Sequence, residues 1–589
     1  MKTKAKLKAL RELMQQKGID AWIVPSGDPH QSEYVADHWK ARAWISGFSG
    51  SAGVCVITSN KAGLWTDSRY WLQAASELED SGIELFKMFS PGVPDYQTWL
   101  LGELSDGAVL GFDGSLLSVR EVAAISKRLS SKNISLSYGE DLIGMIWQGR
   151  PAIPQEPAMM LSEEYSGESV ISKIGRVRLE MQKNMVDYHV ISALDEIAWL
   201  FNIRGKDVKY NPVVISYAFL SKDEVNLFVN ETKLNDELIA FLKTSGVSIY
   251  PYEDILGYLA GLEVDKKMLI DAGMVSQKIK EAIKCQVKED KSIVTYLKGI
   301  KNDVEQEGIR QAHIQDGAAL VRWIYWMKQQ VGKIELDEYT AGEKLGEFRA
   351  EGDKYQGLSF TPIIGFRGNG AIVHYSAKPD TARKIEPDGI LLVDSGGQYL
   401  NGTTDVTRTF SLGKITDEEK YYFTLVLAGH IDLARAVFPK GTSGAMLDTY
   451  TRTALWRDKK NYGHGTGHGV GHFLGVHEGP QNISPKSIAG IFPGSVTTNE
   501  PGMYLEGKFG IRTENILICK TLETTEYGEF CHFETVTLCP ISRELINKEM
   551  LSSDQTAWLD HYHSMVFEKL SPLLKPDIAE WLRNETLPL

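Results

Sequence analysis

The spacing of apolar side chains predicts where the last part of the chain is helical. Between residues 305 and 330 apolar positions such as Ile309, Trp323 and Met327 recur near every 3.6 residues, which predicts one long amphipathic helix. Asn302, with Glu305 three residues on, is a plausible N-cap for it. The tail, 553–585, has a similar pattern interrupted by prolines, and predicts a helical pair that packs on the body.

Between these helices the pattern changes to short strands. We expect β-like runs, punctuated by glycine, at 361–375, 389–394, 405–412 and 510–519, and two helices between them, at 418–438 and 444–457. Pro439 and Gly441 are expected to stop the first of those helices. Strands forming a curved platform covered by helices give an α+β fold for this part of the chain.

The first half of the chain contains an apparent internal repeat. Arg11–Val24 (RELMQQKGIDAWIV) aligns with Arg178–Ile191 (RLEMQKNMVDYHVI), and each segment is typical of an amphipathic helix running into a strand. A second pairing matches Trp44-Ile45 with Trp199-Leu200. Duplication explains both pairings, and chance resemblance of two helix–strand units is the alternative. Alternating strands and helices then predict two small α/β domains.

Two breaks divide the chain into three predicted domains. Pro151, Pro154 and Pro157 interrupt the pattern as an extended linker would, and a charged run within 286–303 marks the second break. The predicted domains are an α/β domain at 1–157, its repeat at 158–302, and an α+β domain with a helical extension at 303–589. A length of 589 residues agrees with about three domains of ordinary size.

Composition and charge narrow the class of protein. Apolar residues make up 43% and charged residues 24%, which is ordinary for a globular protein. The net charge is −13, so the chain as a whole lacks the basic character that binding to nucleic acid or to an anionic membrane requires, although a local basic groove stays open. We therefore expect neither nucleic acid nor membrane as a partner.

The cysteines and the N-terminal segment indicate a cytoplasmic protein. Five scattered cysteines form no disulfide framework and no Cys-x-x-Cys pair, which fits a reducing compartment. Residues 1–17 are basic and amphipathic, unlike the apolar core of a signal peptide, and no stretch approaches 18 apolar residues.

Candidate metal ligands gather in the last 220 residues or so. The set comprises Asp394 in VDSGGQY, Asp405 in TTDVTRT, His468 in HGTGHGVG, Glu500 in NEPGMY and Glu514 in GIRTEN. Each carboxylate alone has an ordinary structural explanation: a turn for the aspartates, a solvated loop for Glu500, an ion pair with Arg512 for Glu514. His468 is harder to explain in this way, because the glycines around it provide no core packing. Together, four carboxylates and one imidazole are what two hard or borderline divalent cations require.

These motifs, in this order, resemble those of the aminopeptidase P (Xaa-Pro aminopeptidase) family of pita-bread metallopeptidases. HQSEY (His30–Tyr34), ISGFSGSAG (Ile45–Gly53), LWTDSRYW (Leu64–Trp71) and ALDEIAWLFNIRG (Ala193–Gly205) extend the resemblance to the first two domains of the long, three-domain, cytosolic-type form. The resemblance covers practically the whole chain. It implies two creatinase-like α/β domains followed by a pita-bread catalytic domain.

The resemblance also assigns site residues. It implies that Asp394, Asp405, His468, Glu500 and Glu514 are the ligands of two metal ions, with Asp405 and Glu514 bridging. Four further residues match active-site positions: His374, His464 and His477 as catalytic and substrate-binding residues, and Arg512 as a substrate-binding residue. His472, in GVGHFLG, receives no role.

The implied activity is removal of one N-terminal residue from peptides with proline in second position. Two cations acidify a bridging water to hydroxide and polarise the scissile carbonyl, and Glu500 is expected to orient that water and move its proton. The resemblance favours Mn²⁺, with Zn²⁺ or Co²⁺ as alternatives, and implies a homodimer. The alternative functions are a prolidase, which cleaves Xaa-Pro dipeptides, and an inactive pita-bread interaction protein.

Overall fold

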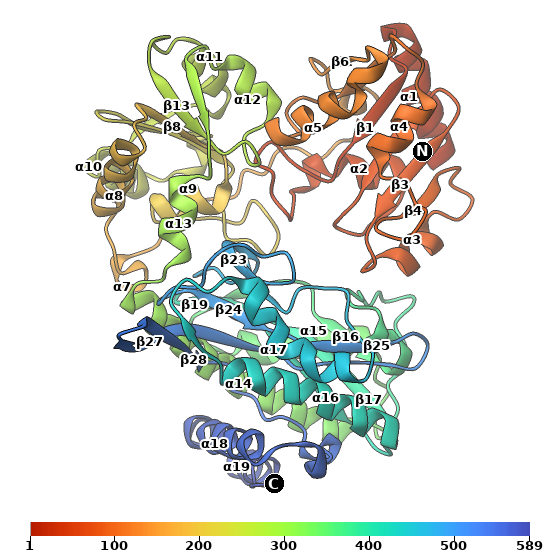
Figure 1. Cartoon of the computed structure of the whole chain (residues 1–589), viewed down its shortest axis with the longest axis vertical. Helices are drawn as coiled ribbons and strands as arrows, with labels where there is room; N and C mark the ends of the chain where they lie inside the picture. The colour runs from red at the N-terminus through yellow and green to blue at the C-terminus, as the bar shows by residue number, and fades with distance from the viewer. Residues whose placement is uncertain (1) are drawn as a thin grey trace. The chain divides into compact units, whose positions relative to one another are not determined.

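The structure is a computed structural model that describes residues 2–589, and it divides into two compact units. Unit 1 runs up to Met160 and continues from Glu168 to Val294. Unit 2 comprises Leu161–Gly167 and Thr295–Leu589. Figure 1 labels the helices and strands of both units. The predicted domain boundaries at 157 and 302 stay predictions.

Unit 1 begins with a six-stranded mixed sheet. Its strands, in spatial order, are β4 (Glu84–Lys87), β3 (Ala62–Thr66), β2 (Val54–Thr58), β1 (Ala21–Val24), β5 (Val109–Phe112) and β6 (Ser135–Ser137). Its helices are α1 (Thr3–Lys17), α2 (Ala41–Ser46), α3 (Trp71–Glu77), α4 (Tyr96–Glu103), α5 (Val119–Leu129) and α6 (Leu142–Ile146). Strand β1 pairs antiparallel with β2 and parallel with β5.

A second six-stranded sheet in unit 1 repeats this order. Its strands are β12 (Ser248–Tyr250), β11 (Val225–Val229), β10 (Ser216–Ser221), β8 (Tyr188–Ile191), β13 (Lys267–Ile270) and β14 (Gln286–Glu289). The helices are α8 (Val170–Lys183), α9 (Leu194–Leu200), α10 (Asp236–Thr244), α11 (Ile255–Ala260), α12 (Gln277–Ala282) and α13 (Ile293–Gly299), which continues into unit 2. A two-stranded pair joins β7 (Met159–Met160) and β9 (Ile203–Arg204).

The repeated order confirms that the first half of the chain is duplicated. The aligned segments form equivalent elements, α1 with β1 and α8 with β8, and the tryptophan pairs fall in α2 and α9. The agreement reaches single atoms: Asp20 Oδ2 accepts from Val109 N at 2.8 Å, and the aligned Asp187 Oδ2 accepts from Lys267 N at 2.9 Å. Chance resemblance would not reproduce this bond in both copies.

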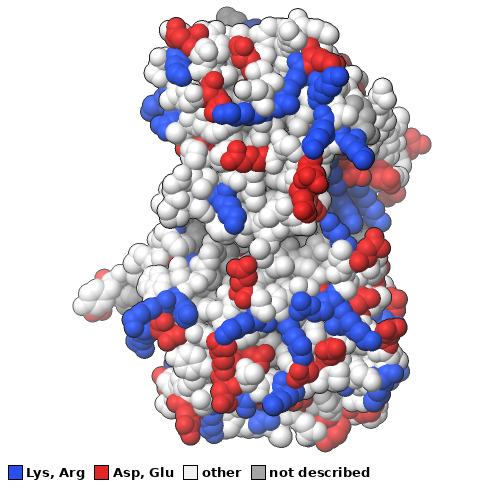
Figure 2. Space-filling model, turned by 90° about the vertical axis from the view of Figure 1, so that its right-hand side faces the viewer, with Lys and Arg blue, Asp and Glu red and all other residues white. Residues whose placement is uncertain are grey.

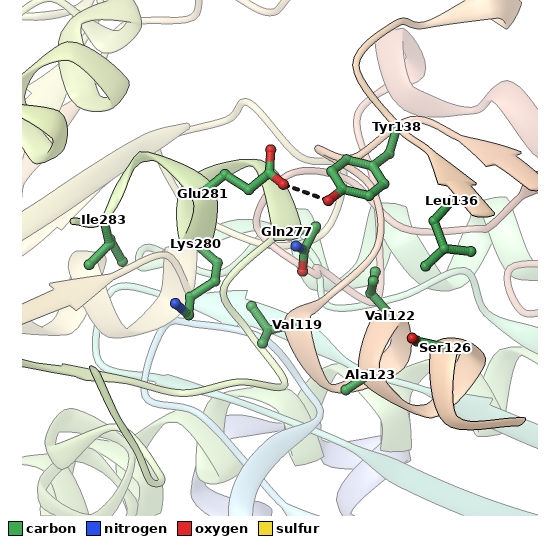
Figure 3. Close-up of a pocket in the computed structure, with 10 residues that line it drawn as sticks. All are labelled: Val119, Val122, Ala123, Ser126, Leu136, Tyr138, Gln277, Lys280, Glu281 and Ile283. Atoms are coloured by element: carbon green, nitrogen blue, oxygen red, sulfur yellow. Dashed lines mark hydrogen bonds between the residues drawn. The ribbon is translucent and has the colours of Figure 1, made fainter. Parts of the chain in front are cut away.

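The two copies meet through equivalent backbone segments. Val119 N donates to Val275 O and Gln277 N donates to Leu117 O, both at 3.0 Å, so the starts of α5 and α12 lie side by side. A cavity of about 690 Å³ opens beside them, where the hydroxyl of Tyr138 donates to Glu281 at 2.5 Å (Figure 3). None of the predicted site residues lines this cavity.

Unit 2 is an α+β structure with strands in four small sheets. In spatial order, the first sheet contains β15 (Tyr355–Leu358), β18 (Gly397–Tyr399) and β19 (Gly402–Thr403), and the second contains β16 (Ile363–Phe366), β17 (Ile390–Ser395) and β20 (Val406–Ser411). The third sheet contains β21 (Val437–Pro439), β28 (Gly528–Thr535), β27 (Asn515–Thr525), β24 (Val496–Asn499), β22 (Gly467–Gly469) and β23 (Glu478–Ile483). The fourth is the hairpin of β25 (Gly502–Leu505) and β26 (Phe509–Arg512). Two more elements are the short helix α7 (Glu163–Ser166) and the 3₁₀ turn Arg367–Ala371.

Helices cover these strands. They are α14 (Asp303–Gln330), α15 (Glu338–Ala350), α16 (Asp417–Ala434), α17 (Gly444–Arg457), α18 (Ser553–Leu570) and α19 (Pro576–Glu585). Figure 1 shows α14, α16 and α17 along the strands, and α18 with α19 at the C-terminal end of the chain. The capping box of Asn302 and Glu305 starts α14 as predicted. The tail also packs on the body as predicted, because Leu559 and Leu582 share a buried cluster with Val426.

Three sequence-based boundaries were wrong. The expected strand at 361–375 ends at Phe366, where Arg367 has a φ of 51° and a 3₁₀ turn begins. Helix α16 ends at Ala434, before Pro439 and Gly441, because residues 437–439 pair with β28 instead. The run 510–519 lies on two different strands, β26 and β27, with Glu514 between them. Tertiary pairing overrides local propensity in all three places.

On the face seen in Figure 2, Lys and Arg side chains are interspersed with Asp and Glu side chains. Every helix in the described part of the chain is too short or too polar to span a lipid bilayer.

Candidate metal centre

Two neighbouring strands of unit 2 bring the first two carboxylates together. Asp394 lies near the end of β17, opposite Thr407 of β20, and Asp405 immediately precedes β20. Both side chains are largely buried, with exposed fractions of 8% and 4%. Antiparallel pairing therefore holds two carboxylates at one edge of the sheet, as the glycine-rich connection between them suggested.

The imidazole comes from β22. His468 Nδ1 donates to Gly469 O at 2.9 Å, which leaves Nε2 facing Asp405 Oδ2 at 3.5 Å and Glu500 Oε1 at 3.7 Å. A ring nitrogen fixed by a backbone carbonyl, with the other nitrogen directed at carboxylates, is the arrangement that metal-binding histidines adopt. Gly467 is required beside it, because a Cβ there would lie 2.0 Å from Thr498 O.

Glu500 and Glu514 complete the cluster from the ends of two other strands, β24 and β27. Glu500 follows β24, and its backbone N donates to Thr466 O at 2.7 Å. Glu514 Oε2 accepts from the hydroxyl of Thr407 at 2.8 Å. Ligand atoms of Asp405, His468 and Glu514 all lie within 4.8 Å of one another. The five predicted ligands, scattered over more than 100 residues of sequence, thus converge on one place.

The electrostatics of the cluster fit a cation-binding site. Burial raises the pKa of Asp394, raises the pKa of Glu500 to about 8, and raises that of Glu514 well above its ordinary value. Burial lowers the pKa of the His468 ring, but Asp405 and Glu500 raise it to about 9. Oδ1 of Asp394 is buried without a hydrogen-bond partner among the described residues. Several buried carboxylates can be ionised together only if positive charge lies near them. The oxygen-rich set of donor atoms fits hard divalent ions.

Arg512 donates hydrogen bonds to one predicted ligand and to two hydroxyl groups beside the cluster. Its Nη2 donates to Asp394 Oδ2 at 2.5 Å, its Nε donates to the Thr407 hydroxyl at 3.1 Å, and its side chain is 2% exposed. Its Nη1 donates to the hydroxyl of Tyr504 at 2.8 Å. The guanidinium therefore orients a predicted ligand and holds Tyr504 in place.

The predicted histidines lie at different distances from the centre. The ring of His477 stands edge-on to His468, with ring centroids 4.3 Å apart. His464 Nε2 lies 2.8 Å from the hydroxyl of Tyr504, and this bond joins it to Arg512. His374 lies half-buried in the loop after the 3₁₀ turn Arg367–Ala371.

Two residues of this network were not predicted. Tyr504 links His464 to Arg512, and Thr407 links Glu514 to Arg512. Both lie inside motifs already noted, NEPGMY and TTDVTRT. Their position within these motifs was the available signal, because hydroxyls carry no metal-binding chemistry that would single them out.

Comparison with known proteins assigns the family. The model of metallopeptidase family M24 matches residues 307–521, and two models of the creatinase/prolidase N-terminal domain match 6–143 and 149–305. A probable Xaa-Pro aminopeptidase P of Laccaria bicolor is 44% identical over 100% of this chain and 94% of its own length. The chain belongs to metallopeptidase family M24. The C-terminal region of peptidase M24 matches 529–589.

Three further proteins are similar to this chain over most of its length or in fold. A probable Xaa-Pro aminopeptidase P of Pyricularia oryzae is 42% identical, with 100% of this chain and 99% of that protein covered. The crystal structure of the X-prolyl aminopeptidase of Caenorhabditis elegans, described as a cytosolic enzyme with a di-nuclear active site, matches over 100% of both chains with a TM-score of 0.95 and 34% identity. A prolidase of Pyrococcus horikoshii shares the fold over 64% of this chain, with a TM-score of 0.51 and 20% identity.

The M24 assignment confirms the resemblance, the fold class and the enzyme class predicted from the sequence. Two creatinase-type N-terminal domains precede a pita-bread metallopeptidase domain. The roles of the individual site residues stay predictions.

Proposed function

We propose that this M24 enzyme removes the N-terminal residue from peptides whose second residue is proline, using two divalent metal ions. The observation that carries the proposal is the convergence of Asp405, His468 and Glu514 within 4.8 Å, with Glu500 3.7 Å from His468. The full-length similarity to Xaa-Pro aminopeptidases P supports the substrate class.

Five residues would hold the ions: Asp394, Asp405, His468, Glu500 and Glu514, with Asp405 and Glu514 as bridging ligands. When bound, the pair supplies Lewis acidity and an acidified water between the ions. Carboxylate-rich ligation favours Mn²⁺, and one imidazole also tolerates Zn²⁺ or Co²⁺. We propose Mn²⁺ for this chain.

The protein groups would orient the substrate and move the proton. Glu500, fixed by its backbone bond to Thr466, takes the proton of the attacking water and returns it to the leaving nitrogen. His477, whose ring stands edge-on to His468, donates in this proposal to the oxyanion that develops in the transition state. We propose that His464, bonded to Tyr504, and His374, in its loop, contact the substrate.

Preference for proline follows from the chemistry of the bond. An Xaa-Pro bond is a tertiary amide without N–H, so a site that relies on that proton cannot cleave it. A site that admits the ring and protonates the leaving nitrogen through Glu500 can. Arg512 acts in this scheme by holding Asp394 in position. A homodimer and a cytoplasmic location belong to the same proposal, and the description of the C. elegans enzyme as cytosolic supports the location.

The test uses three peptides and one chelator. The protein is stripped of metal, reloaded with Mn²⁺, and assayed with an Xaa-Pro-Xaa tripeptide, the matching Xaa-Ala-Xaa tripeptide and a Gly-Pro dipeptide. Turnover of the proline tripeptide alone, lost with chelator and restored by Mn²⁺, is expected. Turnover of the dipeptide alone would identify a prolidase instead. No turnover, with fewer than two ions bound per chain, would point to an interaction protein. Parallel loading with Zn²⁺ and Co²⁺ ranks the metals.

A further inference from the structure

A buried cluster of charge lies next to the metal centre in unit 2. Both carboxylate oxygens of Glu478, the residue after His477, are bound by lysines: Lys298 Nζ lies 2.6 Å from Oε2, and Lys301 Nζ donates to Oε1. All three side chains are 2% exposed or less. We refer to Lys298, Lys301 and Glu478 as the lysine–glutamate triad. No predicted ligand belongs to it.

The two lysines come from the segment that leads into α14. Lys298 lies in the last turn of α13, and Lys301 precedes the N-cap of α14. Backbone contacts anchor this segment, because Lys301 N donates to Gly494 O at 2.9 Å and Ile300 pairs with Ser495. Gly299 is in close contact as well, since a Cβ on it would lie 2.8 Å from Cδ of Pro480. Lys301 Nζ also donates to Lys298 O at 3.2 Å.

Backbone pairing connects the triad to the metal centre. Glu478 begins β23 and pairs with Gly469 of β22, the residue after His468. The approach is tight, because a Cβ on Gly469 would lie 2.4 Å from Glu478 O. His477 precedes Glu478, and its ring stands 4.3 Å from the ring of His468. A displacement of Glu478 would therefore move His477 relative to the metal ligand.

We propose that Lys298 and Lys301 are positioning residues that fix Glu478, and through it the imidazole of His477, at the metal centre. This inference rests on the proposed function. A buried ion cluster contributes little net stability compared with apolar side chains of similar volume, because its desolvation offsets its attraction. Its advantage is directional: two ammonium donors on two carboxylate oxygens fix the orientation of the strand end that carries His477.

The test removes the charges together, because removing one partner alone would leave a buried charge unpaired. The variant is Lys298→Met/Lys301→Met/Glu478→Met in the full Mn²⁺-loaded chain. The matched control is Lys233→Met/Asp207→Met, which removes another buried pair, 2.5 Å apart and 1% exposed on each side, from unit 1. The control is expected to keep the kcat of the wild type.

In the triad variant we expect kcat on an Xaa-Pro-Xaa tripeptide to fall about 10- to 100-fold, the range for residues that orient metal-site groups. KM should change less than about threefold and two ions should remain bound, since the ligands themselves are intact. Adding His477→Ala to the triad variant should cause no further loss, because both changes remove the same group from its place. Unchanged kcat in the triad variant, or losses that multiply with those of His477→Ala, would overturn the proposal.

Two further measurements separate this proposal from the proposed function and from a folding defect. A crystal structure of the triad variant should show the His477 ring displaced from His468, and a ring retained at 4.3 Å refutes the inference whatever the protein hydrolyses. A wild type with no Xaa-Pro turnover would reject the proposed function alone. If the triple variant does not fold, Glu478→Asp, which keeps the charge but shortens the side chain, should show the same fall in kcat with KM unchanged.

Discussion

Glu500 combines two properties at the centre of the site. Its carboxylate lies 3.7 Å from His468 Nε2, where it can contact a cation, and burial raises its pKa to about 8. Burial makes this carboxylate a stronger base than an exposed one, which suits it to accept a proton from water when it is ionised. The proton-accepting role of Glu500 can therefore be tested by a substitution that keeps the size of the side chain.

Glu500→Gln removes the proton-accepting carboxylate and keeps the size of the side chain. The amide keeps the size of the side chain but cannot accept the proton, so we expect kcat to fall about 100- to 10,000-fold. The thermal midpoint should change by only a few degrees. Metal content measured on the same sample distinguishes loss of the base from loss of an ion. Near-normal kcat with two ions bound would remove Glu500 from the proposed role.

The five candidate ligands could be predicted from the sequence only as an ordered set of motifs that resembles a known family, because most of them taken singly have an ordinary structural explanation. A histidine between glycines, as His468 is, packs poorly in a core, and its function shows in its setting. Tyr504 could not be identified in this way, because tyrosine is common in buried strands and its link to Arg512 depends on the hairpin β25–β26. Lys298 and Lys301 could not be identified from the sequence either, since lysines near a predicted domain boundary usually face solvent.

At the scale of elements, β22 is only three residues long yet carries the imidazole. It pairs with β23 on one side and with β24 on the other, so the backbone on both sides of His468 is fixed. The pairing depends on glycine at position 467, where a Cβ would lie 2.0 Å from Thr498 O. A glycine here is needed for close approach of two backbones.

Gly467→Ala tests this dependence. We expect the added methyl to push β22 away from β24 and to move His468, with weaker Mn²⁺ binding and loss of about 2 to 4 kcal/mol of stability from overpacking and lost hydrogen bonds. Isothermal titration with Mn²⁺ and urea unfolding measure the two effects. Gly346→Ala is the control, because a Cβ there meets no atom within 4 Å. Wild-type metal affinity in Gly467→Ala would show that the strand tolerates the shift.

Helix α18 attaches to the body through a histidine that must stay neutral. The backbone N of Ile541 donates to His563 Nε2 at 3.1 Å, which occupies the nitrogen that a second proton would need. Burial lowers the pKa of His563 to about 3, and the cations Arg408 and Arg543 add to the effect. Below pH 6.5, the ordinary value, the unfolded chain binds a proton that the folded chain does not.

Acid should therefore weaken the fold through His563. Stability from this group is complete above pH 6.5 and is lost at about 1.4 kcal/mol per pH unit as the pH falls towards 3. Urea unfolding of unit 2 at pH 7.0, 6.0 and 5.0 should show a shallower pH dependence for His563→Gln than for the wild type. Equal slopes for the two proteins would mean that His563 takes up its proton in the folded state.

At the scale of the whole molecule, the duplicated half shows what sequence pattern can and cannot predict. The helix–strand repeat in the sequence identified both copies. The structure agrees, because the aligned residues Asp20 and Asp187 accept equivalent hydrogen bonds. The path between the copies was not predictable. Leu161–Gly167 belongs to unit 2, where Asn302 Nδ2 donates to Ser166 O at 2.9 Å. A segment of seven residues is too short to show a periodic pattern. Its place in unit 2 is evident only from its contact with Asn302, the N-cap of α14.

The division into units leads to a prediction for the whole chain. All five candidate ligands lie in unit 2, and unit 1 has hydrophobic cores of its own. Metal bound to one unit stabilises that unit by mass action, by about 2.7 kcal/mol at a concentration of 100 times Kd. Calorimetry of chelated and Mn²⁺-loaded protein should show the transition of unit 2 moving to higher temperature while that of unit 1 stays in place.

Hydrogen exchange on peptides from α8 and α14 assigns the two transitions, because these helices lie in different units. The variant Asp405→Ala/Glu514→Ala lacks both predicted bridging ligands and should show no Mn²⁺-dependent shift. A shift of equal size in both transitions of the wild type would contradict the expectation, since binding energy confined to unit 2 can reach unit 1 only if the two unfold as one cooperative body.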